Sequence, residues 1–307
     1  MRFTRRTFVR SAAGALAASA FDWTVFAQAQ SPEPMMTRTI PSTNEKIPVI
    51  GMGTWQTFDE DPADAEAMTR LSDVLKTFHA GGGRVIDSSP MYGRSETVTG
   101  TLSSKLNLNS DFFMATKVWT RGREAGVAQM NDSITKLGRQ KIELMQIHNL
   151  LDVAAHLPVL HEMKAGGRIK YIGVTHYQQN AFDDLERIIR AEKIDFVQLP
   201  FSVDAPEAQK RLIPAARDSG VAILVMRPFG GGELFGRVRG KPLPDHVKAY
   251  ADSWAQAFLK FILAEEAVTA TLPATRKPHH MADNLRAGAG RLPTAQERQQ
   301  LTVAVVG

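Results

Sequence analysis

The sequence contains no cysteine among its 307 residues, so it forms no disulfide, no iron–sulfur cluster and no cysteine-ligated zinc site, and it offers no thiol nucleophile. It also lacks any run of 18 apolar residues, which excludes an ordinary membrane-spanning helix. Hydrophobic residues still make up 43% of the chain, which is enough for a sizeable buried core. The length suits either one large α/β barrel or two ordinary domains.

The first 29 residues are predicted to be an export signal. They contain the pair Arg5-Arg6 with a phenylalanine two positions on, a weakly apolar run from Ser11 to Phe21, and the small-x-small cleavage pattern Ala27-Gln28-Ala29. This combination resembles a twin-arginine export signal, although an ordinary basic amphipathic N-terminus shares part of it. We therefore expect the twin-arginine translocase as a partner during export. The periplasm is then the expected location, with the cytoplasm as the alternative if the leader is not used.

The charge balance gives no reason to expect a nucleic-acid partner. The net charge of +5 includes four arginines and one aspartate from residues 1–29, so the remaining 278 residues carry only +2. Residues 30–37 are polar and contain proline, which predicts a linker, and residues 38–307 are the predicted folded domain. A hairpin is expected at its start, pairing Arg38–Ile40 with Lys46–Ile50 across a turn at residues 42–44.

After the hairpin the sequence alternates between strand-like and helix-like patterns. Short apolar runs begin near residues 85, 113, 143, 170, 195, 221 and 268, and Val49–Trp55 precedes them as the first strand. Apolar residues at three- and four-residue steps predict helices in the gaps. Examples are Met68, Leu71, Val74, Leu75 and Phe78, then Val127, Met130, Ile134 and Leu137, then Phe182, Leu185, Ile188 and Ile189. Glycines stand where such helices should end, at residues 81–83, 166–167 and 220.

Eight strand–helix units in a chain of this length predict a (β/α)8 TIM barrel behind the N-terminal β-hairpin. A doubly wound open sheet is the alternative. No Gly-x-Gly-x-x-Gly fingerprint follows the first strand, however, which argues against a Rossmann domain. Barrel enzymes hold their active sites where the strands end, so the residues that follow each strand are the ones to inspect.

Four chemically distinct side chains stand at those strand ends. They are a carboxylate, a phenol, an ammonium and an imidazole: Asp87, Tyr92, Lys117 and His148. Each alone has an ordinary structural explanation, such as a cap, a loop anchor, a solvated charge or a buried histidine. Their expected convergence on one barrel mouth is what indicates a catalytic set.

These residue types match the requirements of carbonyl reduction. The developing alkoxide needs a proton donor, and a free tyrosine, whose pKa is about 10, is a reluctant one. An ammonium beside Tyr92 would lower that pKa, a carboxylate would hold the ammonium, and an imidazole would orient the carbonyl. Tyr92 is then the general acid, Lys117 its tuner, Asp87 the partner of Lys117 and His148 the orienting group. Because no side chain donates hydride, a nicotinamide cofactor is implied.

From about Ile47 to Leu292 the sequence resembles the aldo-keto reductases. The motifs that carry the resemblance are, in chain order, Gly51–Trp55, Val85–Gly93, Ala115–Lys117, Gln146–Asn149, Gly173–Tyr177, Val197–Leu199, Leu272–Pro278 and Asp283-Asn284. The resemblance implies a (β/α)8 reductase that binds NADP in an extended form and reduces a small-molecule carbonyl compound. It assigns the four residues at the strand ends the roles given above.

The resemblance also implies where the cofactor and the substrate would lie. The implied cofactor-binding residues are Thr54, Asp87, Thr175, His176, Gln198, Met226, Arg227, Pro228, Gly230, Thr275, Arg276, Lys277, His280 and Asn284. The implied substrate-pocket residues are Trp55, Trp119 and Asn149. The segment Gly230-Gly231-Gly232, with basic residues shortly after it, is either a flap over the pyrophosphate or a solvated loop.

Three positions depart from the family pattern. Thr175-His176 replaces a common Ser-Asn pair, and Met226 replaces a tyrosine that stacks on the nicotinamide in many members. His280 stands near the place of a common arginine contact to the 2′-phosphate. Arg276 and Lys277 are expected to supply the missing positive charge, so NADP is expected over NAD.

Two other functions compete with this interpretation. Lys117 at a strand end could form a Schiff base in an aldolase, which borohydride trapping would reveal. A non-catalytic, NADP-binding barrel that senses redox state would bind the cofactor without turnover. A metal site is not expected, because His156, His161 and Glu162 fit no zinc-binding spacing and are predicted to lie on the surface of a helix.

Overall fold

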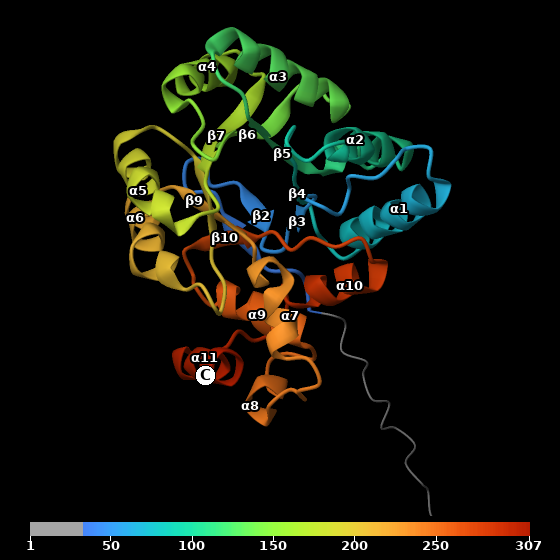
Figure 1. The fold of residues 1–307 in the computed structure, drawn as a ribbon, viewed down its shortest axis with the longest axis vertical. Helices are drawn as coiled ribbons and strands as arrows, with labels where there is room; N and C mark the ends of the chain where they lie inside the picture. The colour runs from blue at the N-terminus through green and yellow to red at the C-terminus, as the bar shows by residue number, and fades with distance from the viewer. Residues whose placement is uncertain (1–32) are drawn as a thin grey trace, which may run out of the picture. The chain divides into compact units, whose positions relative to one another are not determined.

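Eight parallel strands close into a barrel in the computed structural model, which describes residues 33–307 (Figure 1). Each strand pairs with its neighbours in chain order, and parallel bridges from Ile50 to Thr271 and from Gly53 to Ala274 join the last strand to the first. The strands are β3 (Met52–Gly53), β4 (Val85–Asp87), β5 (Phe113–Val118), β6 (Ile142–His148), β7 (Ile169–Thr175), β8 (Phe196–Pro200), β9 (Ala222–Met226) and β10 (Val268–Thr271). The predicted TIM barrel is confirmed. The predicted export signal lies outside the described residues and stays a prediction.

The first barrel strand is shorter than the predicted Val49–Trp55. Only two residues of that run pair with β4. The residues before them bond to the last strand instead, since Gly51 donates its N–H to the carbonyl of Thr271 and Thr271 donates to the carbonyl of Val49. This part of the chain therefore serves as the seam that closes the barrel.

Helices surround the strands on the outside of the barrel (Figure 1). Eight of them follow strands in the predicted alternation: α1 (Ala65–Ala80), α2 (Ser95–Lys105), α3 (Arg123–Lys136), α4 (Val153–Ala165), α5 (Phe182–Ala191), α6 (Leu212–Asp218), α9 (Trp254–Leu263) and α10 (Pro278–Arg286). Three more are α7 (Glu233–Arg237), α8 (Asp245–Lys248) and α11 (Ala295–Val306), and short 3-10 turns span Asn109–Asp111, Gln179–Ala181, Glu207–Lys210 and Gly230–Gly232. Among residues 33–307, no helix has the length and apolar character needed to cross a bilayer.

Local signals in the sequence explain where α1 begins and ends. Its N-cap residue Asp64 accepts a hydrogen bond from the Ala67 N–H at 3.0 Å. The predicted apolar positions Leu71 and Phe78 are completely buried against the barrel. Beyond the last turn, Gly82 takes a φ of +87°, a left-handed conformation that glycine adopts without steric cost. The predicted glycine stop is confirmed here.

Alternation along the strands decides which side chains enter the barrel. Successive residues of a strand point to opposite faces, so every second side chain points inward. At one end of the barrel the interior is filled by a cluster of buried apolar side chains. Its members are Ile40, Ile47, Val85, Phe113, Ala115, Leu144, Tyr171, Phe196, Ala222, Leu224, Ala270 and Leu272. Counting two or four residues onward from Val85, Phe113 and Leu144 gives Asp87, Lys117 and His148. The same two-residue alternation that fills the barrel with apolar side chains therefore places three charged or titratable side chains at the carboxyl end of the barrel.

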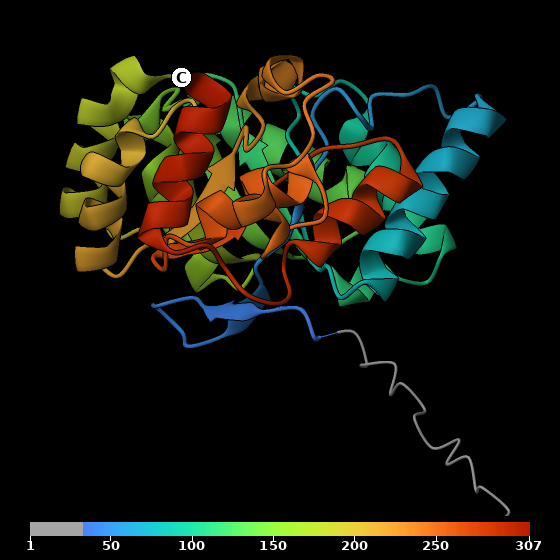
Figure 2. The same ribbon diagram turned by 90° about the horizontal axis from the view of Figure 1, so that it is seen from below.

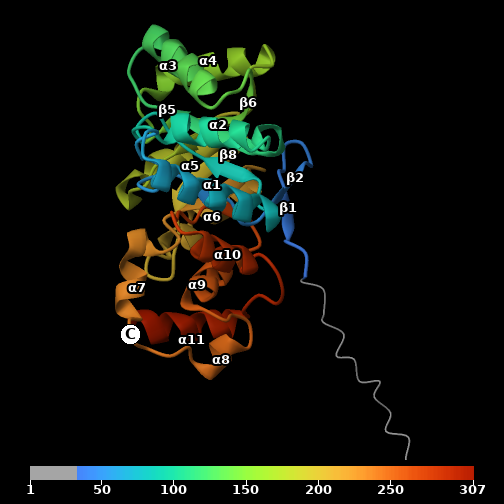
Figure 3. The same ribbon diagram turned by 90° about the vertical axis from the view of Figure 1, so that its right-hand side faces the viewer.

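The N-terminal hairpin covers the opposite end of the barrel. Its strands β1 (Thr37–Thr39) and β2 (Lys46–Pro48) are antiparallel, with Arg38 paired to Ile47, so the predicted hairpin is confirmed with a start one residue earlier. The Arg38 guanidinium donates to carbonyl oxygens of Glu265, Val268 and Leu263 around β10. Figures 2 and 3 show the hairpin across one end of the barrel and α7 at the other. The hairpin closes one end, which leaves the end with Asp87 and Lys117 as the entrance.

Candidate active site

A buried ion pair lies at the centre of the barrel mouth. Lys117 Nζ donates to Asp87 Oδ2 at 2.6 Å and to the Ser88 carbonyl oxygen at 2.7 Å. The Lys117 side chain is completely buried and the Asp87 side chain is 6% exposed. The other carboxylate oxygen, Oδ1, accepts from Gln146 Nε2 at 2.9 Å. The predicted partnership of Asp87 with Lys117 is present, and Gln146 completes it.

Sequence reasoning did not identify Gln146 as a site residue. It stands two residues before His148 on the inward face of β6, and it is in register with Lys117 of β5. The two-residue period of a strand is the signal that indicates it. A residue two positions before His148 must point into the barrel, so a polar residue there must lie near Lys117.

Tyr92 lies directly beside the Lys117 ammonium. It follows β4 in a turn where its N–H donates to the Ser89 carbonyl at 2.9 Å, and Lys117 Nζ is 5.0 Å from the centre of its ring. Burial, and then the negative charge of Asp87, raise the pKa of Tyr92, while the charge and hydrogen bond of Lys117 oppose that rise. The expected net lowering of the Tyr92 pKa is therefore wrong. The phenol stays protonated, which is the form that donates a proton.

Lys117 keeps its positive charge despite its burial. Burial alone would lower the pKa of Lys117, but the negative charge of Asp87 and the hydrogen bonds of the ammonium to Asp87 and Tyr92 raise it above its usual value. An uncompensated ammonium at this depth would be very unfavourable. The carboxylate of Asp87 therefore does more than orient Lys117, because it also keeps the ammonium charged inside the barrel.

His148 completes the group as a neutral imidazole. Its ring meets the Tyr92 ring edge-on with 5.7 Å between centroids, and its Nδ1 lies 2.9 Å from Ser89 Oγ. Burial, followed by the positive charge of Lys117 and the proximity of His176, lowers the pKa of His148 to about 3. A neutral ring can donate a hydrogen bond from one nitrogen while accepting one at the other.

This lowered pKa predicts an acid-sensitive contribution to stability. The unfolded chain binds a proton at His148 below pH about 6.5, whereas the folded protein does so only near pH 3. The free energy of unfolding therefore decreases as the pH is lowered through this window. We expect His148 to account for a loss of about 2 kcal/mol in the free energy of unfolding between pH 7 and pH 5. Urea unfolding of the wild type and of His148→Gln at both pH values measures this loss. Equal losses in the two proteins would contradict the prediction.

Two adjoining cavities run from the ion pair across the barrel mouth. The first, of about 340 Å³, contacts Asp87, Tyr92 and Gln198, and the second, of about 310 Å³, contacts His280 and Asn284. Phe229, Phe235 and Ala274 line both cavities. The two cavities therefore lie side by side, and we call them together the mouth groove.

Most of the expected cofactor and substrate residues lie along the mouth groove. The first cavity is lined by Thr54, Trp55, Asp87, Gln198, Met226, Arg227, Pro228 and Arg276, and the second by Thr275, His280 and Asn284. Gly231 and Gly232 line the first cavity in place of the expected Gly230. Thr175 reaches the groove indirectly, because its hydroxyl donates to Gln198 Oε1 at 3.2 Å.

The remaining expected residues lie beside the groove or away from it. Lys277 lines neither cavity, and the His176 ring stacks on Tyr177 at 5.7 Å. Trp119 lines neither cavity, but its ring is 6.4 Å from His148, and its side chain is well exposed. Asn149 follows His148 with a left-handed φ of +52°, and within residues 33–307 its buried Oδ1 has no hydrogen-bonding partner.

Among residues 33–307, no three His, Cys, Asp or Glu side chains are placed to hold a metal ion. The predicted surface position of His156 is wrong. Its side chain is completely buried and its Nε2 lies 2.8 Å from the Thr120 carbonyl, because α4 packs against α3 at Gly126. Glu162 of the same helix does lie at the surface, where it pairs with Arg123 at 2.6 Å.

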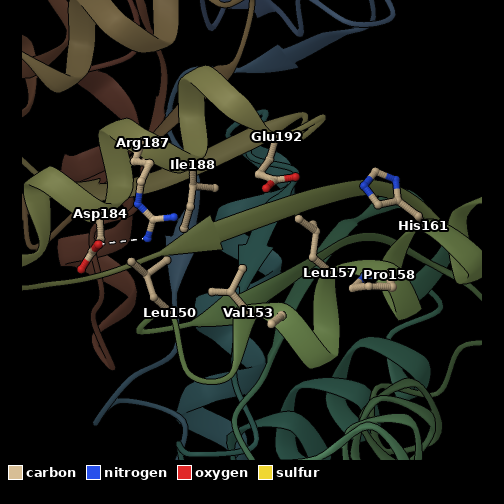
Figure 4. Close-up of a pocket in the computed structure, with 10 residues that line it drawn as sticks. Leu150, Val153, Leu157, Pro158, His161, Asp184, Arg187, Ile188 and Glu192 are labelled. Atoms are coloured by element: carbon tan, nitrogen blue, oxygen red, sulfur yellow. Dashed lines mark hydrogen bonds and ion pairs between the residues drawn. The ribbon is translucent and has the colours of Figure 1, made fainter.

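A larger cavity of about 710 Å³ lies on the outside of the barrel between α4 and α5 (Figure 4). Val153, Leu157 and Ile188 give it an apolar floor, and an ion pair of Arg187 with Asp184 at 3.0 Å lies at one end. No tyrosine or lysine lines it. The group formed by Asp87, Tyr92, Lys117 and His148 therefore lies at the mouth groove and not at this larger cavity.

The comparisons with known proteins agree with this fold. The model of the aldo/keto reductase family matches residues 49–301. By sequence, the chain is 26% identical over 247 residues to the uncharacterized oxidoreductase YtbE of Bacillus subtilis, covering 78% of this chain and 82% of that protein. It is 24% identical over 239 residues to the NADH-specific methylglyoxal reductase of Escherichia coli, covering 68% and 72%.

Solved structures show the same fold. An aldo-keto reductase from Klebsiella pneumoniae in complex with NADPH superposes with a TM-score of 0.71 at 19% identity, covering 88% of this chain and 96% of that one. The Bombyx mori aldo-keto reductase in complex with NADP gives a TM-score of 0.71 at 19% identity, covering 88% and 93%. The chain belongs to the aldo/keto reductase family. It is accordingly an oxidoreductase of the class that reduces carbonyl groups with a nicotinamide cofactor.

Proposed function

We propose that the protein reduces an aldehyde or ketone with NADPH at the barrel mouth, and that Tyr92 donates the proton. The observation that carries this proposal is the buried pair of Lys117 and Asp87 at 2.6 Å beside the Tyr92 ring, at the inner end of the mouth groove. The same groups would serve the reverse reaction, the oxidation of an alcohol, because a proton donor in one direction is the acceptor in the other.

The mouth groove fits a nicotinamide dinucleotide in an extended form. The buried Nε2 of Gln198 has no partner within residues 33–307, and a carboxamide oxygen in the first cavity would satisfy it. Gly231 has a φ of +74° and a Cβ there would lie 2.8 Å from Arg227 Nη2, so the absence of a side chain lets this guanidinium lie directly against the backbone. Such a cradle suits a pyrophosphate. When bound, the nicotinamide supplies the hydride that no side chain can supply.

Tyr92 would deliver its proton to the carbonyl oxygen as negative charge develops there. Its raised pKa keeps the phenol protonated at neutral pH, and the nearby ammonium of Lys117 stabilises the phenolate that remains after transfer. The neutral imidazole of His148, whose ring is next to that of Tyr92, would hold the same carbonyl oxygen by a hydrogen bond. Trp55, which lines the first cavity and is 40% exposed, supports an apolar wall for the substrate.

The state of Lys117 favours this role over a Schiff-base aldolase. A lysine that attacks a carbonyl must be neutral and free of strong partners. Lys117 has a raised pKa and donates to both Asp87 and the Ser88 carbonyl, which supports a fixed ammonium. We therefore propose that the Lys117 ammonium acts on the pKa of the Tyr92 phenol.

We propose NADPH over NADH because of the charge available at the groove. Burial, with the neighbouring charges of His279 and Lys277, lowers the pKa of His280, so this residue supplies little positive charge at neutral pH. Arg276 lines the first cavity, and within residues 33–307 its guanidinium has two partners, Glu60 at 3.4 Å and the Gln56 carbonyl at 3.2 Å. It is the cation best placed to turn toward a 2′-phosphate.

Titration of the purified protein with NADPH and NADH, read by tryptophan fluorescence, tests this proposal. We expect NADPH to bind at least about tenfold more tightly, and Arg276→Met to weaken NADPH about tenfold with little effect on NADH. Arg187→Met on α5, which also removes an exposed, paired arginine, is the control and should change neither affinity. Equal affinities for the two cofactors, or an equal loss of both in Arg276→Met, would refute the proposed preference.

A further inference from the structure

Ser89 touches both proton-handling groups of the site, although it has no assigned role. Its side chain is completely buried in the turn that follows β4. The Ser89 hydroxyl oxygen accepts from the Met91 N–H at 3.2 Å and lies 2.9 Å from His148 Nδ1. Its carbonyl accepts from the Tyr92 N–H at 2.9 Å. One serine thus links the turn that holds Tyr92 to the ring of His148.

The direction of the hydrogen bond between Ser89 and His148 can be worked out from the partners of the hydroxyl. If His148 Nδ1 carried the proton, Ser89 Oγ would accept twice, and its own proton would need an acceptor. Within residues 33–307 this hydroxyl forms no hydrogen bond other than those to Met91 and His148. That arrangement would leave a buried O–H unsatisfied, which is unfavourable. If Ser89 donates to Nδ1 instead, the hydroxyl is satisfied as both donor and acceptor.

We propose that Ser89 is a positioning residue that fixes His148 in the tautomer with its proton on Nε2. Nε2 has no hydrogen-bonding partner within residues 33–307, and the ring faces Tyr92 edge-on at 5.7 Å. A proton on Nε2 makes His148 a donor to the carbonyl oxygen of a substrate. A proton on Nδ1 would instead present a lone pair, which repels that oxygen. The catalytic consequence rests on the proposed carbonyl reduction, whereas the tautomer itself does not.

The tautomer can be measured without any substrate. We would label the eight histidines of the protein with ¹⁵N, record long-range ¹H–¹⁵N correlations, and assign His148 from the signals lost in His148→Gln. We expect a protonated Nε2 and an unprotonated Nδ1 in the wild type. Ser89→Ala removes the donor to Nδ1, so we expect the tautomer protonated on Nδ1 to become populated.

Kinetics supply the second readout. We expect Ser89→Ala to lower kcat about tenfold and to leave the affinity for NADPH unchanged. The matched control is Ser103→Ala, which removes another completely buried serine hydroxyl, in α2, where it donates to the Thr99 carbonyl at 2.7 Å. This control should change neither the His148 signals nor kcat. A fold-wide effect of losing a buried hydroxyl would appear in both variants.

Two results would overturn the proposal: a protonated Nδ1 in the wild type, or an unchanged tautomer together with an unchanged kcat in Ser89→Ala. If Ser89→Ala does not fold, the wild-type spectrum decides alone. A wild-type protein that shows the expected tautomer but reduces no carbonyl compound would refute the proposed function and still support the role of Ser89 in fixing the ring. The two failures are therefore distinguishable.

Discussion

Tyr92→Phe is expected to lower kcat for carbonyl reduction by about 10²- to 10⁴-fold, the range typical of losing a general acid. Phenylalanine keeps the ring that packs against His148 and Lys117 but removes the proton that the carbonyl oxygen needs. The mouth groove keeps its shape, so the affinity for NADPH should stay within about twofold of the wild type. Steady-state kinetics and a fluorescence titration of the same preparation measure both quantities.

Tyr250→Phe provides a matched control for this experiment. Tyr250 is also buried, burial raises its pKa to about 12, and its hydroxyl has no hydrogen-bonding partner within residues 33–307. It lines neither cavity of the mouth groove. We expect wild-type turnover from this control, and full turnover in Tyr92→Phe would eliminate Tyr92 as the proton donor.

Lys117→Met is expected to affect both turnover and stability. Without the ammonium, the phenolate that follows proton transfer loses its stabilising charge, so kcat should fall by about 10²-fold or more. The variant also leaves the Asp87 carboxylate buried without its cation, which should lower the free energy of unfolding by about 3–5 kcal/mol. Urea unfolding and steady-state kinetics measure the two losses separately.

The double variant Asp87→Asn/Lys117→Met separates the two effects of the lysine. Asparagine removes the buried negative charge and can still accept from Gln146, so much of the lost stability should return. Turnover should not return, because the double variant still has no charge beside Tyr92. A double variant with restored turnover would show that Lys117 supports turnover only by stabilising the folded protein.

The barrel could be predicted from the sequence because its signals are local and repeated. Each apolar run is a strand buried on both faces, and each interval carries a helical period, which in several cases ends at a glycine. The seam was not predictable in the same way. Val49 and Gly51 belong to an apolar run like the others, but their backbone partners lie on β10, more than 200 residues away in the chain. Only closure of the barrel decides which neighbour they pair with.

The proposed catalytic set follows from residue types, whereas its supporting residues do not. Asp87, Lys117 and His148 differ chemically from their apolar surroundings, so they stand out at strand ends. Gln146 and Ser89 look like ordinary polar residues, and only the register of β5 with β6 and the shape of the turn after β4 bring them to Asp87 and His148. The role of such a residue depends on a single hydrogen bond, and that bond is set by how the chain packs. The spacing of apolar residues in the sequence carries no information about it.

The direction of the Tyr92 pKa shift shows a related limit. The residue types predict the attraction of the Lys117 ammonium for a phenolate, which is present, but they do not indicate how deeply the phenol is buried. In the folded protein burial is the larger effect and the net pKa of Tyr92 rises. His156 was misplaced for the same reason, because its burial follows from the close approach of α3 to α4 at Gly126.

The central claim is that the mouth groove carries out carbonyl reduction with NADPH, and multiple-turnover kinetics test it most directly. The purified protein would be given NADPH and a panel of aldehydes and ketones, with alcohol formation and NADPH consumption followed together. The account predicts sustained, stoichiometric conversion of at least one carbonyl compound, which is lost in Tyr92→Phe. Tight NADPH binding without turnover on any compound, or a carbonyl adduct trapped on Lys117 by borohydride, would contradict it.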